Sequence, residues 1–210
     1  MSAEQLKQRD AMQRLTDFLN EVGMLRHTPR SGYKFLGSGQ ETVAEHSHRT
    51  AVIGYALAKK TGADAARTVM LCLFHDLPEA RTGDFNYVNR LYDTSRERDA
   101  LEDAVEGTGL EEDIMSIWDE HACRTSPESL LAHDADQLDL ILNLKRESDL
   151  GNRYADKWLE SAVERLRTDI AKELAQTILK TDQRIGGISA PIAAGGKGRA
   201  DHPGFSTLFS

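Results

Sequence analysis

The sequence predicts an all-α protein in which one helical domain, residues 1–185, is followed by an irregular tail, residues 186–210. Apolar residues recur with helical spacing through most of the chain before the tail. No stretch alternates between apolar and polar residues for long enough to build a sheet. The length of 210 residues, with 40% hydrophobic and 29% charged residues, suits one globular domain with some length to spare.

The first amphipathic helix is expected over residues 6–22, where apolar side chains recur with the spacing of one helix face and Gly23 ends the pattern. The next stretch, residues 26–40, contains a proline and several glycines and is expected to be a loop. A second helix should begin near Thr42 and end at Gly62, with His46 on its apolar face.

A third helix should begin at Asp64, a favoured N-cap residue, and should run to the adjacent pair His75-Asp76. Pro78 disrupts its continuation, and residues 82–86 are expected to form a turn. The pair is the most informative feature of the chain, because it follows an apolar run that otherwise reads as core helix. Burying two strongly solvated groups there is costly unless a partner such as a metal ion compensates.

The second half of the chain should hold four more helices and the tail. Residues 94–105 predict a charged, mostly exposed helix, and residues 110–121 predict another. Ser126-Pro127 marks a helix start, with serine as N-cap and proline in the first helical position. A last long helix is expected over 152–179. The tail is rich in small residues without helical period, so we expect it to lie outside the core.

Composition excludes several classes of partner. A net charge of −8 disfavours broad binding to a nucleic-acid polymer, although one or two local cations could still hold a small phosphorylated ligand. The N-terminus lacks a signal peptide pattern, and no apolar run approaches the ~20 residues of a membrane span. Cys72 and Cys123 show no paired spacing. We therefore expect a cytoplasmic protein without a membrane segment.

Four candidate metal ligands lie on three separate predicted helices: His46, His75, Asp76 and Asp136. Ligands from separate helices can converge inside a bundle. Two nitrogens and two carboxylates would suit Mn, Co, Fe, Ni, Zn or Mg about equally, and a metal in such a shell can acidify water and polarise a phosphoryl oxygen.

Each candidate also has a simpler structural interpretation. A lone histidine on an apolar helix face is more often a satisfied core residue than a ligand, and Asp136, beside Asp134, could be a solvated carboxylate. His48 lies two residues from His46 and so points to another face of the helix. We interpret His48 as a non-ligand, and His121 and His133 as surface or structural residues. Only the ordered set favours a metal site.

The pattern His46, His75-Asp76, Asp136 resembles the HD-domain metal-dependent phosphohydrolase superfamily. Flanking segments 41–47, 75–84 and 135–142 resemble its 5′-deoxynucleotidase branch, over somewhat more than half of the chain. The resemblance implies an all-helical HD-domain bundle, one divalent metal ion per chain, a homodimer, and a small-molecule nucleotide substrate. The implied reaction is hydrolysis of deoxyribonucleoside 5′-monophosphates.

The resemblance also implies roles for single residues, with the four candidate ligands matching the metal ligands of the family. Glu79 matches the acidic residue that acts on water or on the leaving group, although it could be a solvated carboxylate. Arg30 would hold the phosphate, and Tyr33 would pack on the sugar or base. Asp84 would accept a hydrogen bond from a 3′-hydroxyl, although Gly83-Asp84 could be only a turn.

Three alternatives remain open from the sequence. One is an HD hydrolase of another phosphorylated nucleotide, such as guanosine tetraphosphate, against which Ala80 after Glu79 is a modest argument. Another is a two-iron HD oxygenase, for which His121 or His133 would have to supply further ligands. The last is a non-catalytic nucleotide-binding HD module that regulates a partner.

Overall fold

The computed structural model describes residues 3–181, which form helices and short connections around a three-helix centre. Within this range the chain has no β-strand, and its extended backbone pairing is an isolated bridge between Pro29 and Thr42. The all-α prediction is therefore confirmed. The predicted tail, 186–210, and the predicted domain end at residue 185 lie outside the described residues.

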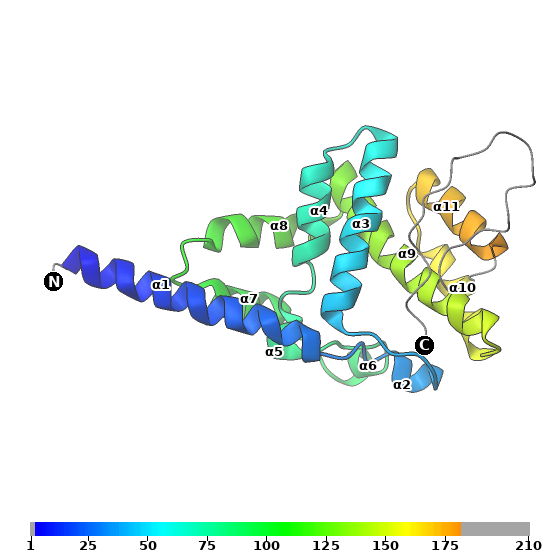
Figure 1. Ribbon diagram of the computed structural model, residues 1–210, viewed down its shortest axis with the longest axis horizontal. Coiled ribbons are helices and arrows are strands. Elements are labelled where there is room, and N and C mark those ends of the chain that lie inside the picture. Colours follow the sequence, from blue (N-terminus) through cyan, green and yellow to red (C-terminus); the bar gives the residue numbers. More distant parts are fainter. Residues whose placement is uncertain (1–2, 182–210) are drawn as a thin grey trace, which may run out of the picture.

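The centre of the bundle consists of α3 (Val43–Thr61), α4 (Ala65–Phe74) and α9 (Pro127–Asp149). Figure 1 shows α3 and α4 side by side, with α9 running past both. The helices approach closely at Gly54 of α3, where a Cβ would lie 2.6 Å from Sγ of Cys72 on α4 and 3.7 Å from Cβ of Ala135 on α9. A larger side chain at Gly54 would force α3 away from the two helices that it must meet at the candidate site.

The starts of these helices follow from their capping residues. Thr42 caps α3 through a capping box with Glu45, and Gly62 ends that helix in a left-handed conformation. Asp64 accepts hydrogen bonds from two backbone amides at the start of α4. Ser126 caps α9, with proline in the first turn. Each of these boundaries was predicted from the sequence.

The N-terminal part packs beside this centre. Helix α1 (Ala3–Val22) continues into the 3-10 helix η1 (Gly23–His27) and lies along α7 (Glu97–Val105), as Figure 1 shows. Helices α5 (Glu79–Thr82) and α8 (Glu111–Cys123) complete this side. Its apolar cluster includes the following buried residues: Phe18, Leu25, Val43, Leu77, Leu101, Val105 and Ile114.

Short helices replace parts of the predicted loops. Segment 26–40 contains the end of η1 and α2 (Tyr33–Leu36), and α6 (Asn89–Tyr92) precedes α7. The helix predicted from residue 94 begins at Glu97. Thr82 belongs to α5, and residues 83–86 are non-helical rather than a turn. No helix within residues 3–181 combines the length and the apolar character needed to cross a membrane.

The prediction of a single helix over 152–179 is wrong. The chain forms α10 (Tyr154–Glu164) and α11 (Asp169–Lys180), both packed on α9. Thr168 caps α11, while the buried carboxylate of Asp134 on α9 accepts hydrogen bonds from the Arg167 and Thr168 amides at 2.8 and 2.7 Å. The break is therefore fixed by a contact with a helix distant in the sequence.

Candidate metal centre and active site

The four candidate ligands converge where α3, the end of α4 and α9 meet. His46 lies on α3, His75 is the C-terminal cap of α4 with Asp76 beside it, and Asp136 lies on α9. Nε2 of His46 is 3.2 Å from Oδ1 of Asp136 and 3.6 Å from Oδ2 of Asp76. Nε2 of His75 is 3.1 Å from the same oxygen of Asp76. Ligand atoms of His46, His75 and Asp136 all lie within 4.8 Å of one another.

The two imidazoles are oriented by their other ring nitrogens. Nδ1 of His46 lies 2.8 Å from Oδ2 of Asp139, and Nδ1 of His75 lies 2.8 Å from the backbone oxygen of Cys72. Both Nε2 atoms are buried and have no hydrogen-bond partner within the described part of the chain. A histidine that is anchored by one nitrogen and presents the other is the usual arrangement of a metal ligand. The donor set therefore fits a divalent cation.

The electrostatics of the site also favour a cation. Burial and the nearby Arg30 guanidinium lower the pKa of His46, but the adjacent carboxylates of Asp136 and Asp139 outweigh them and raise it to about 10. Carboxylates that attract a proton this strongly would equally attract a divalent metal, whose binding would release that proton.

Asp139 is a functional residue that the sequence reasoning missed. It is fully buried one helical turn beyond Asp136, and Arg49 donates a hydrogen bond to its other carboxylate oxygen. Nη2 of Arg49 also lies 3.2 Å from Oε1 of Glu41, to which Asn143 donates at 2.9 Å. The i, i+3 spacing of two aspartates on one helix could have identified it. His46, Asp139 and Glu41 also lie close enough to form a second ligand group, although Nδ1 of His46 already faces Asp139.

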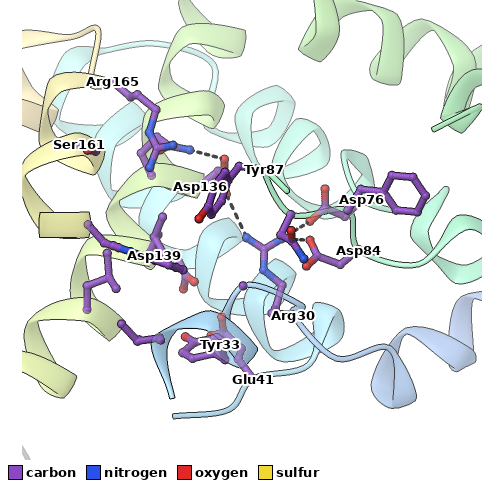
Figure 2. A pocket seen from close by; sticks show the side chains of 18 of the residues that line it. Arg30, Tyr33, Glu41, Asp76, Asp84, Tyr87, Asp136, Asp139, Ser161 and Arg165 are labelled. Carbon is purple, nitrogen blue, oxygen red and sulfur yellow. Dashed lines mark hydrogen bonds and ion pairs between the residues drawn. The ribbon is translucent and has the colours of Figure 1, made fainter. Parts of the chain in front are cut away.

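Arg30 lies among the carboxylates, as Figure 2 shows. Its Nη1 is 3.2 Å from Asp76 and 3.5 Å from Asp84, and its Nη2 is 3.9 Å from Asp136. Burial opposes its charge, but these three carboxylates outweigh burial and raise its pKa. The guanidinium is thus permanently charged and sits directly beside the candidate ligands.

Glu79 is buried at the start of α5, with Oε2 lacking a hydrogen-bond partner among the described residues. Burial and the charges of Asp76 and Asp84 raise its pKa to about 10. These surroundings therefore favour the protonated form of the carboxyl group. The simple alternative of a solvated carboxylate is excluded, because only 5% of the residue is exposed.

Asp84 and Tyr33 line the cavity in different ways. Asp84 accepts hydrogen bonds from the backbone amide and the hydroxyl group of Ser31, the latter at 2.8 Å. It therefore anchors the segment that carries Arg30, and its contact with a sugar hydroxyl stays a prediction. Tyr33 on α2 packs under Gly39, and burial raises the pKa of its hydroxyl group.

The two candidate carboxylate ligands, Arg30, Glu79, Asp84 and Tyr33 line one cavity of about 570 Å³, and the two histidines are buried behind it. Its floor holds the candidate ligands Asp76 and Asp136 with Arg30 and Glu79. Its other wall comes from α9 and α10, and Figure 2 shows Ser161 and Arg165 on the side opposite Asp76 and Asp84. The volume lies within the range of about 300–1,000 Å³ that is common for small-ligand sites.

The three histidines interpreted from the sequence as non-ligands take different positions. His48 is exposed, as expected of a non-ligand. His133 is buried with Nε2 3.3 Å from the backbone oxygen of Arg165, which agrees with a structural role. His121 is closer to the site than expected, because its ring centroid lies 5.0 Å from that of His75. Burial and the proximity of His75 lower the pKa of His121 to about 3, so its imidazole is neutral.

Known proteins resemble this chain in sequence and fold. Residues 22–178 match the HD domain family. A 5′-deoxynucleotidase HDDC2 of Danio rerio is 28% identical over 145 residues, which are 66% of this chain and 72% of the relative. A 5′-deoxynucleotidase of Enterobacter sp. (strain 638) is 30% identical over 147 residues, or 61% and 73% of the two chains. A solved conserved hypothetical protein from Pyrococcus furiosus has 26% identity and a TM-score of 0.65, covering 78% of this chain and 96% of that one.

Proposed function

The chain belongs to the HD domain family, and from that premise we propose that it is a metal-dependent phosphomonoesterase that releases phosphate from deoxyribonucleoside 5′-monophosphates. The observation that carries the proposal is the pair of buried Nε2 atoms, on His46 and His75, that converge with two carboxylates lining a cavity of about 570 Å³. The 5′-deoxynucleotidases among the relatives support the choice of substrate.

The metal ligands in this proposal are His46, His75, Asp76 and Asp136. A bound divalent ion would acidify a water molecule and polarise a phosphoryl oxygen, and its identity among Mn, Co, Fe, Ni, Zn and Mg stays open. The tie from Nδ1 of His46 to Asp139 fixes the tautomer that presents Nε2.

Arg30 and Glu79 would act on the substrate. The Arg30 guanidinium neutralises phosphate oxygens through charge-assisted hydrogen bonds. Glu79 supplies a proton from its carboxyl group to the departing 5′-oxygen of the sugar, or orders the attacking water. The first role is favoured by the raised pKa of Glu79. Such general acid–base help contributes roughly 10²–10⁴ in rate.

Tyr33 and Asp84 would shape the sugar subsite. Tyr33 presents its ring to the cavity from α2, where it can pack on the sugar. Asp84 already accepts hydrogen bonds from Ser31, so a contact with the 3′-hydroxyl would have to share those oxygens. The same carboxylate would then link sugar recognition to the position of Arg30.

We further propose a homodimer in the cytoplasm, on the resemblance of the chain to its family. Within the described residues Cys72 and Cys123 are both free, and Cys72 is buried, which suits a reducing compartment. Light scattering on the purified protein measures the oligomeric state: a mass near twice 23.3 kDa supports the dimer, and a mass near 23.3 kDa contradicts it.

The proposed function is tested by phosphate release after chelation and re-addition of each divalent metal. Deoxyribonucleoside monophosphates, ribonucleoside monophosphates and guanosine tetraphosphate are compared as substrates. We expect metal-dependent phosphate release with a preference for the deoxyribonucleotides. Release of pyrophosphate from the tetraphosphate would favour the rival hydrolase, and nucleotide binding without turnover with any metal would favour a regulatory module.

A further inference from the structure

The cavity has a second, aromatic end that the chemistry at its floor does not use. Tyr87 follows the non-helical segment 83–86, and Trp158 lies on α10. Both line the same cavity as Asp136 and Arg30. The two ring centroids are 6.4 Å apart with planes at 87°, so the rings form a right-angled corner. A flat aromatic ligand lying on one ring would meet the other at its edge, which is a favourable geometry.

This corner is not explained by the core. Tyr87 is 63% exposed, and its other aromatic neighbour, Phe35 on α2, is 50% exposed. Large apolar surface that remains exposed beside a cavity marks a ligand or partner site more often than a structural one. Trp158, in contrast, is packed in part against the main core cluster and is therefore held in place.

Trp158 also contacts the short backbone segment that carries Arg30. The indole of Trp158 packs on Gly32, where a Cβ would lie 3.6 Å from Cζ3. Gly32 follows Arg30 by two residues, so the side chain that faces the carboxylates and the surface that supports the indole belong to one short segment. A ligand that places a phosphate beside Arg30 can therefore reach the corner with its other end.

Few polar groups at this end are free to read the edge of a base. Asn86 donates to the Ser31 hydroxyl at 2.9 Å, while its side-chain oxygen accepts from the Val88 amide at the same distance. Nε of Arg90 donates to the backbone oxygen of Phe85. Within residues 3–181, the exposed side chains of Ser161 and Arg165 have no hydrogen-bond partner, and Oε1 of Gln137 is buried without one, so these are the main groups that edge reading would use.

We propose that Tyr87 and Trp158 form the nucleobase subsite and hold the base by stacking rather than by hydrogen bonds to its edge. This inference rests on the proposed function and adds the rule by which substrates are selected. Stacking on an aromatic side chain tolerates every base, because each base has a π-face. The enzyme should thus accept all four deoxynucleoside monophosphates, with purines ahead of pyrimidines because they stack over a larger area.

The test compares deoxynucleotides with 2-deoxyribose 5-phosphate, which carries the phosphate and sugar but no base. The unmodified enzyme should hydrolyse dAMP with a kcat/KM about 5- to 150-fold above that for the base-free ester, the range that one stacked base provides. Trp158→Ala and Tyr87→Ala should each lower this ratio about tenfold, and Trp158→Phe should keep most of it. The ratio compares two esters on the same protein, so a general loss of folded or active enzyme cancels, and circular dichroism checks the fold of each variant.

Two control variants make the result specific. Tyr154→Ala removes an aromatic ring that is 74% exposed on the same helix α10 but does not line the cavity, so the ratio should not change. Arg165→Ala should change the relative rates for the four bases by less than about twofold. A tenfold loss confined to one base in Arg165→Ala would show edge reading and overturn the stacking proposal.

The outcomes separate this inference from the function on which it rests. If the unmodified enzyme hydrolyses neither dAMP nor the base-free ester with any metal, the proposed function fails. If it hydrolyses both with equal kcat/KM, or if Tyr87→Ala and Trp158→Ala leave their ratio intact, the reaction stands and the nucleobase subsite is refuted.

Discussion

The candidate metal ligand His46 and the cavity residue Tyr87 are held in different ways. His46 is fully buried on a long helix, with its Nδ1 bound to a buried carboxylate, whereas Tyr87 is 63% exposed beside a non-helical segment. Ligands on packed helices cannot move without disturbing the core, so they preserve the geometry that chemistry requires. Residues on short segments can be replaced at little cost, and such segments suit substrate selection.

Asp136→Ala should cause the largest loss of metal affinity and activity, because it removes one of the four candidate metal ligands. We expect metal affinity and phosphate release to fall together, by more than the about 10–100-fold that loss of a supporting partner costs. Isothermal titration with the metal and a phosphate-release assay measure both quantities. A variant that stays fully active without bound metal would contradict the ligand assignment.

Glu79→Gln should lower turnover without weakening metal binding at the same site. Turnover should fall by roughly 10²–10⁴, since the proton source is lost, while the metal affinity should stay near that of the unmodified protein. Glu160→Gln, at an exposed site on α10, is the matched control and should leave both unchanged. An equal loss of metal and turnover in Glu79→Gln would instead make Glu79 part of the ligand shell.

Asp139→Ala should show how far the metal site depends on the residue that orients His46. Loss of the carboxylate that orients His46 should weaken metal binding about 10–100-fold. Asp139→Asn keeps an acceptor for Nδ1 of His46 and should lose less. Unchanged metal affinity in a folded Asp139→Ala protein would show that the His46 ring needs no such anchor.

Asp134→Ala should have the smallest effect on the site, although Asp134 lies two residues from Asp136 on α9. Its carboxylate receives hydrogen bonds from the Arg167 and Thr168 amides, so its loss should lower the free energy of unfolding by about 1–3 kcal/mol. Urea denaturation measures this change, and metal affinity should be unaltered. A large loss of metal affinity would contradict the structural role of Asp134 and would indicate that it also supports the metal site.

Local signals explain which parts of the fold could be predicted from the sequence. The caps at Thr42, Asp64 and Ser126 act within one helical turn, and each marks a real helix start. The break between α10 and α11 was missed because Asp134, which lies 33 residues before Arg167, helps to fix it. Apolar spacing continues across that break and carries no sign of the distant contact.

The residues of the candidate site also differ in how far the sequence alone could predict them. The order His46, His75-Asp76, Asp136 is visible in the sequence, and the structure brings all four together. Asp139 could have been found from its helical spacing to Asp136. The pairing of Tyr87 with Trp158 could not, because it joins a loop to a helix late in the chain through packing alone.

The most direct test of the account is the anomalous diffraction of crystals of the full chain loaded with Mn²⁺. We predict one strong peak per chain, enclosed by Nε2 of His46, Nε2 of His75 and the carboxylates of Asp76 and Asp136. A peak at another position, or no peak under conditions that support phosphate release, would contradict the central claim that these four side chains bind the metal.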